Sequence, residues 1–168
     1  MSTISEPIVT SVAAGQGNSY LLAPGEIMTF KAVGEQTGGL YMMAELSVRP
    51  GGGPPLHTHP PQEHFLILEG TFEIPTIRDG QRRVIRATAG DVIHMPGGVP
   101  HTYKNVGEKP GRFMLTLSPA SMQEFFFALG LPITDPAHLP ELSGPPDMEW
   151  LGALFQKYDI KFLEPFGP

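Results

Sequence analysis

Two glycine-framed stretches that carry histidines constrain this chain more than any other feature of its sequence. The first reads Gly51-x5-His57-x-His59-x3-Glu63-x6-Gly70, and the second reads Gly90-x5-Pro96-x-Gly98-x2-His101-x3-Asn105. Glycine adopts positive φ angles at little steric cost, so the framing glycines indicate tight turns or close backbone approach. Each stretch is therefore expected to fold as a hairpin that holds its polar residues at fixed places.

The spacing within these stretches predicts a metal site. In an extended strand, residues i and i+2 face the same side about 6–7 Å apart, so His57 and His59 can point at one place. Pro60-Pro61 cannot continue a paired central strand because proline has no ladder N–H, and the chain should bend there and bring Glu63 back. Neighbouring strands lie ~4.8 Å apart, so a ring from the second hairpin can converge on the same place. The expected ligands are His57, His59, Glu63 and His101.

Three imidazoles and one carboxylate suit one divalent transition metal, which we expect to be Fe, Mn, Ni, Co, Cu or Zn. They do not suit Ca or Mg, which prefer oxygen ligands alone. Four ligands on a six-coordinate ion leave two positions for water, dioxygen or a substrate, and such openness is typical of catalytic metal sites. The alternatives are buried histidines without a metal, or a metal that only stabilises the barrel.

Glycine and proline punctuate alternating apolar segments, which indicates an all-β fold of many short strands. The chain has 168 residues with 20 glycines and 19 prolines. The clearest strand covers residues 40–48, where Leu40, Met42, Ala44, Leu46 and Val48 share one face. Asp79-Gly80 predicts a two-residue hairpin turn. The other strands are expected at 20–22, 28–33, 65–68, 71–74, 91–95, 101–105 and 112–117, the spacing of a sandwich or jelly roll.

The sequence changes character after Ser118. The capping-box pattern Ser121-x-x-Glu124 predicts a helix over 122–129, with Gly130 and Pro132 behind it as stop signals. A proline-rich link over 132–146 leads to a second expected helix over 148–157. We therefore expect an N-terminal arm (1–18), a β-barrel (19–118) and a helical C-terminal tail (119–168) that packs on the barrel or on a partner subunit.

Both histidine stretches match, position for position, the two conserved motifs of the cupin superfamily. The resemblance covers residues 40–117 closely. It implies an antiparallel jelly-roll β-barrel in which His57, His59, Glu63 and His101 bind the metal. Within the superfamily, the whole chain is most similar to the flavonol (quercetin) 2,3-dioxygenase-like group. That similarity is carried by His57-Thr-His59-Pro-Pro-Gln-Glu63 and, more weakly, by Phe125-Phe126, Leu129-Gly130 and Lys157-Tyr158-Asp159-Ile160 in the tail.

The resemblance implies a concrete reaction. A flavonol hydroxyl would bind an open metal position and lose its proton to Glu63, a ligand that doubles as general base. Dioxygen would then cleave the C2–C3 bond, releasing carbon monoxide and a depside. The alternatives are a metal-dependent isomerase or decarboxylase, or a non-catalytic metal- or ligand-binding cupin.

The expected interior favours a small apolar or aromatic substrate over a sugar phosphate. No cluster of Arg and Lys lies near the motifs to bind a phosphate, and Arg82, Arg83 and Arg86 are expected to form a solvated rim. For any single lining residue, plain core packing is the more expected role, and only together do these residues favour such a substrate. The expected lining residues are Phe30, Tyr41, Met43, Phe65, Phe72, Met95, Tyr103 and Phe113.

The remaining histidines have less to do with a metal. His64 follows Glu63 directly, so strand alternation should point it away from the site. His94 either lines the cavity or faces outward, and His138 is expected on the surface of the proline-rich link.

Composition excludes several classes of partner. The net charge of −6 argues against nucleic acid as a partner. No segment approaches the ~20 apolar residues of a membrane span, and no cysteine is present to form a thiolate site. Without a signal-peptide pattern, we expect a cytoplasmic protein. A homodimer is expected, because two-fold dimers are the commonest assembly and jelly-roll edges need cover.

Overall fold

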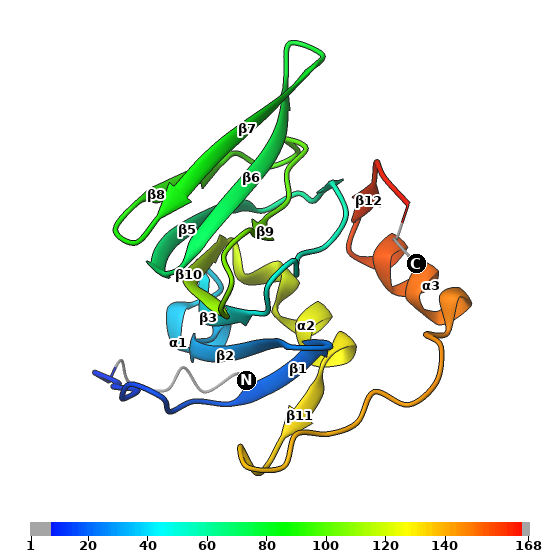
Figure 1. The fold of residues 1–168 in the computed structure, drawn as a ribbon. Coiled ribbons are helices and arrows are strands. Elements are labelled where there is room, and N and C mark those ends of the chain that lie inside the picture. Colours follow the sequence, from blue (N-terminus) through cyan, green and yellow to red (C-terminus); the bar gives the residue numbers. More distant parts are fainter. Residues whose placement is uncertain (1–7, 166–168) are drawn as a thin grey trace.

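Short strands joined by glycine turns build an antiparallel jelly-roll barrel in the computed structural model, which describes residues 8–165 (Figure 1). One sheet has the strand order β11-β1-β2-β3-β10-β5-β8, a second has the order β7-β6-β9, and β12 pairs with β4. The strands are β1 (Ser19–Ala23), β2 (Glu26–Ala32), β3 (Met42–Val48), β4 (His57–Thr58), β5 (Gln62–Glu69), β6 (Thr71–Arg78), β7 (Gln81–Thr88), β8 (Val92–Met95), β9 (Lys104–Asn105), β10 (Gly111–Ser118), β11 (Leu131–Ile133) and β12 (Lys161–Phe162).

The interior of the barrel follows from side-chain alternation in its central strands. Every second residue of β3 and β10 is buried, as the period of an extended strand requires. The register sets Phe113 opposite Leu46, and the Phe113 ring contacts Phe65 and Phe72 at centroid distances of 4.4 and 5.3 Å. These rings fill the space between the two sheets next to the histidine-bearing segments.

The expected strand over 40–48 starts later than its pattern indicates. Leu40 is 70% exposed and Tyr41 is also exposed, whereas Met42 is the first buried residue of β3. The short helix α1 (Gly34–Thr37), which the sequence did not reveal, ends at Gly38 with φ 63° and is followed by a turn. Leu40 lies in that turn and not in the sheet, so its place in the alternating pattern is accidental.

The predicted turns are confirmed. Arg78 pairs with Gln81 across a two-residue turn in which Asp79 and Gly80 have φ angles of 51° and 71°. Positive φ at both positions matches the twist of the flanking strands. The four framing glycines at 51, 70, 90 and 98 likewise have positive φ angles, between 73° and 95°.

Three helical segments follow β10 in the described residues, and their bounds test the tail predictions. A 3-10 turn, η1 (Ala120–Met122), leads into α2 (Gln123–Leu129), and α3 spans Met148–Lys157 as expected. The capping box at Ser121 and Glu124 is wrong: the helical turn begins earlier, and no side chain caps η1 or α2. Asp147 caps α3 instead, accepting the N–H groups of Glu149 and Trp150 at 3.0 Å.

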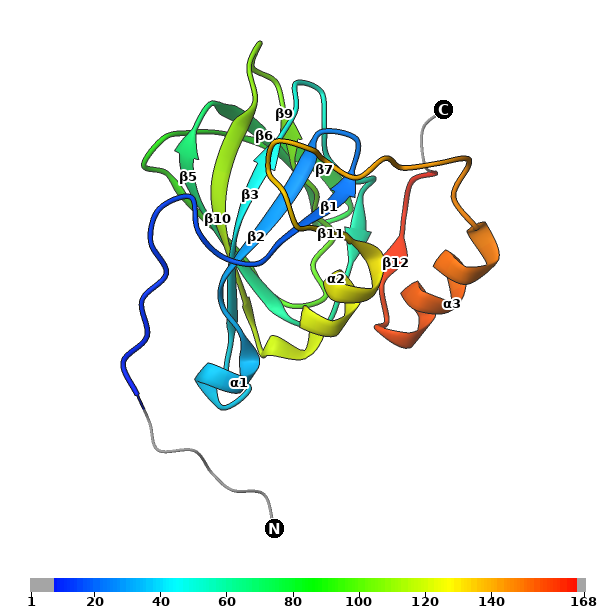
Figure 2. The ribbon, with the colours of Figure 1, turned by 90° about the horizontal axis from the view of Figure 1, so that it is seen from below.

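The tail lies against the barrel (Figure 2). Leu154 of α3 and Ile160 are buried in the same cluster as Met122 and Phe125. The proline-rich link is less irregular than expected, because β11 pairs with β1 at its start. Of the expected N-terminal arm, residues 8–18 contain no helix or strand, and 1–7 lie outside the described residues. Within residues 8–165, no helix has both the length and the apolar character to cross a membrane.

Candidate metal centre

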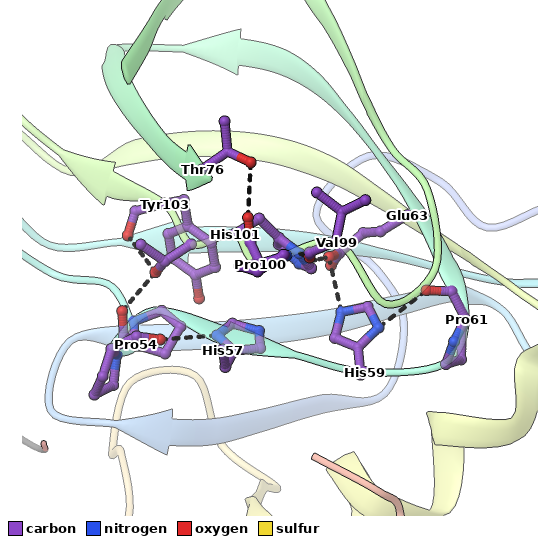
Figure 3. A network of polar contacts seen from close by, with 12 residues as sticks. Pro54, His57, His59, Pro61, Glu63, Thr76, Val99, Pro100, His101 and Tyr103 are labelled. Atoms are coloured by element: carbon purple, nitrogen blue, oxygen red, sulfur yellow. Dashed lines mark hydrogen bonds and ion pairs between the residues drawn. The ribbon is translucent and has the colours of Figure 1, made fainter. Parts of the chain in front are cut away.

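The backbone brings the two histidine stretches together (Figure 3). His57 lies in β4 and forms a bridge with His101, in which the His57 N–H donates to the His101 carbonyl at 3.1 Å and the His101 N–H donates back at 2.9 Å. The Gly98 N–H donates to the carbonyl of His59 at 2.8 Å. Glu63 projects from β5 toward the same place. These main-chain bonds hold the imidazoles of two distant segments in one cluster.

The three imidazoles are oriented for a shared ion. Ligand nitrogens of His57, His59 and His101 all lie within 4.8 Å of one another. In each ring Nδ1 is within hydrogen-bond reach of a backbone carbonyl, those of Pro55, Pro61 and Val99, at 2.8, 3.0 and 2.8 Å. An Nδ1–H that donates to a carbonyl fixes the tautomer, so the lone pair is on Nε2. This is the arrangement that metal-binding histidines adopt.

Glu63 completes the cluster by contact with two of the three rings. Its Oε2 atom lies 2.6 Å from Nε2 of His101 and 3.1 Å from Nε2 of His59. If every Nδ1 carries the proton, the Glu63 carboxylate faces the Nε2 lone pairs of His59 and His101, and the negative charge and the lone pairs repel each other. A cation between them makes the arrangement favourable. Either a proton or a metal ion can supply that charge, so the donor set fits a divalent transition metal.

Electrostatics point to the same need for a cation. Burial alone would raise the pKa of Glu63, but its hydrogen bonds to His101 and His59 outweigh burial and lower that pKa to about 2. Burial opposes protonation of His101, but contact with Glu63 raises the pKa of His101 above its ordinary value. Burial and the neighbouring His101 lower the pKa of His57 to about 4. The cluster thus keeps the carboxylate ionised and His57 neutral, as ligands must be.

Three of the four residues are nearly closed to solvent, whereas His57 is half-buried. His59, Glu63 and His101 are only 4%, 6% and 1% exposed. Two hydroxyls anchor the backbone beside His101: Thr76 donates to the Pro100 carbonyl at 2.7 Å, and Thr102 donates to the Pro54 carbonyl at 2.5 Å. A metal held here would lie among few competing waters, where charge interactions are strong.

A supporting contact that sequence reasoning missed lies beside the cluster. Gly53 has a φ of 141°, and a Cβ at this position would lie 1.8 Å from the Tyr103 carbonyl. The Gly53 N–H donates to the buried Glu26 carboxylate at 2.7 Å, and the Tyr103 hydroxyl donates to the same group at 3.3 Å. Burial raises the pKa of Glu26, although these donors and Arg49 oppose the shift. The run of three glycines at 51–53 was the available signal.

The structure corrects part of the expected lining of the barrel interior. Tyr41 is exposed and Met43 lies on the outer face of β3, so neither lines the interior. Of the remaining expected residues, Tyr103 is half-buried and packs against the core, and the others are buried. The buried ones are Phe30, which lies beside α2, Phe65, Phe72, Met95 and Phe113.

The histidines outside the cluster face outward. His64 contacts His94 across β5 and β8, with Nε2 and Nδ1 2.8 Å apart, and His94 is exposed. His138 is also exposed and contacts Asp135 at 2.7 Å. Within the described residues, the predicted ligands therefore gather in one place, and the three other histidines lie elsewhere.

The comparisons with known proteins agree with this picture. Residues 44–117 match the cupin domain family. The chain is 28% identical over 156 residues, 92% of its length, to quercetin 2,3-dioxygenase of Bacillus subtilis. It is 33% identical over 107 residues, 60% of its length, to a germin-like protein of Mesembryanthemum crystallinum. It spans 44% and 45% of these relatives, less than half of each.

A solved structure supports the fold. An RmlC-like cupin from Shewanella frigidimarina superposes with a TM-score of 0.56 at 20% identity, covering 70% of this chain and 96% of that one. The likeness at this identity concerns the jelly-roll architecture alone.

Proposed function

Because the chain belongs to the cupin superfamily and gathers three histidines and a carboxylate in a buried cluster, we propose that it is a metal-dependent dioxygenase that cleaves a flavonol-like aromatic substrate with O2. The observation that carries this proposal is the extent of the similarity to quercetin 2,3-dioxygenase. That similarity covers 92% of the chain, beyond the 44–117 segment common to cupin domains and into the helical tail.

We assign His57, His59, Glu63 and His101 as the ligands of one divalent ion, either Fe, Mn, Ni, Co, Cu or Zn. When bound, the ion supplies Lewis acidity that lowers the pKa of a substrate hydroxyl. The carbonyls of Pro55, Pro61 and Val99 hold the imidazoles in the ligating tautomer. Main-chain bonds between β4 and the His101 segment keep the rings in place while substrate binds.

Glu63 has a second role in this proposal, as the base that accepts the substrate's hydroxyl proton at Oε2. Burial raises the pKa of Glu63, but contact with His101 and His59 outweighs burial and holds that pKa low, so this carboxylate accepts a proton only from a strongly acidified hydroxyl. The metal and Glu63 therefore have to act on the same hydroxyl. The apolar rings behind the cluster, including Phe65 and Phe113, keep water away from the resulting anion.

An oxygen-uptake assay tests the proposal. The purified chain, loaded in turn with each candidate metal, should consume O2 and release carbon monoxide when quercetin is added. Glu63→Gln should lower turnover by about 10²- to 10⁴-fold while retaining part of the metal. His64→Gln is the matched control, because this neighbouring side chain contacts His94 instead of the cluster, and it should leave turnover unchanged.

Two outcomes would overturn parts of the proposal. Full turnover in Glu63→Gln would remove Glu63 as the base. A fully metal-loaded protein that consumes no O2 with any flavonol would leave the metal-dependent isomerase, the decarboxylase and the non-catalytic binding protein as the remaining functions.

A further inference from the structure

The end of the tail pairs with the strand that carries a metal-site histidine. Phe162 of β12 is the register partner of His57 in β4, and Lys161 is the partner of Thr58. The next residue continues the contact, because the Leu163 N–H donates to the Leu56 carbonyl at 2.8 Å. In Figure 1, β12 lies beside the segment that leads into β5, with α3 packed next to it. The tail therefore covers this side of the cluster.

An aromatic side chain of the tail lies beside the cluster itself. Partners in an antiparallel pair place their side chains on the same face, and the rings of Phe162 and His57 have centroids 5.7 Å apart. Phe155 of α3 lies behind Phe162 at 4.8 Å, and Phe155 in turn contacts Phe125 of α2 at 6.1 Å. A layer of rings thus leads from His57 outward into the helical tail.

The backbone attachment of this layer to β4 is short. Its ladder to β4 has two residue pairs, and its end is held by an exposed ion pair between Arg82 of β7 and Glu164. The segment before α3, residues 134–147, contains no helix or strand. Residues 148–165, which we name the tail cover, can therefore separate from β4 without breaking any strand of the two larger sheets. Opening also has to expose Leu154 and Ile160, which are buried in the core cluster, but it leaves the barrel strands paired and therefore costs less than global unfolding.

His59, Glu63 and His101 are almost fully buried, and the half-buried His57 has the Phe162 ring beside it. A planar aromatic molecule that is to lie against His57 on this side therefore has to displace that ring. We propose that the tail cover is a detachable wall of the metal centre, and that an aromatic ring of the substrate takes the place of the Phe162 ring beside His57. The substrate class named here rests on the proposed function, whereas the opening of the cover does not.

An engineered disulfide tests the opening. Thr58→Cys with Lys161→Cys places thiols on two register partners whose Cα atoms lie about 5.5 Å apart, within disulfide range. The chain has no cysteine of its own, so oxidation can lock only this pair. The probe is dipicolinate, a planar aromatic chelator, and the readout is the rate at which it removes Zn from the metal-loaded protein.

The oxidised variant should lose Zn at least about tenfold more slowly than the reduced variant, with equal Zn content at the start. Each single variant should match the wild type under both conditions. Equal rates of Zn removal from the oxidised and the reduced double variant would overturn the proposal that the tail cover detaches. An O2-uptake assay with quercetin separates this proposal from the proposed function. If the oxidised double variant loses Zn slowly but the reduced, metal-loaded protein consumes no O2 with quercetin, the tail cover stands and the dioxygenase activity is rejected.

A second variant tests the role of Phe162 without a cross-link. Phe162→Ala removes the ring contacts with Phe155 and His57, so the cover should open more often and dipicolinate should remove Zn about fivefold faster. Met148→Ala is the control, because that exposed side chain lies at the far end of α3. A removal rate in Phe162→Ala equal to that of Met148→Ala would show that Phe162 does not hold the cover closed.

Discussion

Asn105→Ala should destabilise the fold more than most single substitutions, although Asn105 is not a ligand. Its side chain is fully buried and makes three hydrogen bonds. The amide donates to the carbonyls of Val48 and Lys109, both at 2.8 Å, and accepts the Gly107 N–H at 2.9 Å. Three bonds at about 1 kcal/mol each, together with the loss of a donor to the buried Val48 carbonyl, give a loss of about 3 to 4 kcal/mol.

Urea denaturation followed by circular dichroism measures this loss as a fall in the free energy of unfolding. Asn105→Asp keeps the acceptor for Gly107 but loses both donated bonds, and it should cost about 2 kcal/mol or more. Lys104→Ala, on the exposed neighbour, should stay within about 0.5 kcal/mol of the wild type. A fall in the free energy of unfolding of less than about 1 kcal/mol in Asn105→Ala would refute the reasoning that these three hydrogen bonds stabilise the end of the second histidine stretch.

Three further predictions concern the surroundings of the cluster. Gly53→Ala should lower the free energy of unfolding in urea by at least about 3 kcal/mol, since its Cβ would clash with the Tyr103 carbonyl. Gly80→Ala, with open space around its Cβ, should lower it by about 1 kcal/mol, and equal losses in the two variants would contradict this reasoning. Burial raises the pKa of Glu26 in the folded state, so its ionisation costs stability once pH rises above the ordinary carboxyl pKa. Glu26→Gln should therefore gain stability relative to wild type between pH 4 and pH 7, and a difference independent of pH would refute it. Light scattering should give the mass of a homodimer, and a monomer would contradict the expected two-fold assembly.

The local part of this structure was readable from the sequence. Asp79-Gly80 predicts its hairpin because both residues tolerate positive φ angles. The helix over 148–157 is likewise indicated by its own residues. The position of His57, His59, Glu63 and His101 in one cluster follows from strand geometry and from the glycines that set the turns. For the turn, the helix and each histidine stretch, the signal lies within a few neighbouring residues, whereas the meeting of the two stretches was expected from their match to the cupin motifs.

The parts that escaped prediction depend on partners far away in the chain. A strand of two residues such as β12 has no period to read, and its pairing with His57 joins segments about a hundred residues apart in sequence. Leu40 fits an alternating pattern by accident because α1 intervenes. In the sequence Glu26 is indistinguishable from an exposed charged residue, and its burial depends on the distant Gly53, whose N–H donates to its carboxylate. Such contacts are set by tertiary packing, which overrides local pattern.

The central claim, that His57, His59, Glu63 and His101 hold one metal ion, is tested most directly by elemental analysis of the purified protein. The wild type and His64→Ala should each bind roughly one transition-metal ion per chain, whereas His101→Ala should retain less than about a tenth of that at the same free-metal concentration. Equal metal content in His101→Ala and His64→Ala would contradict the assignment of the cluster as the metal centre.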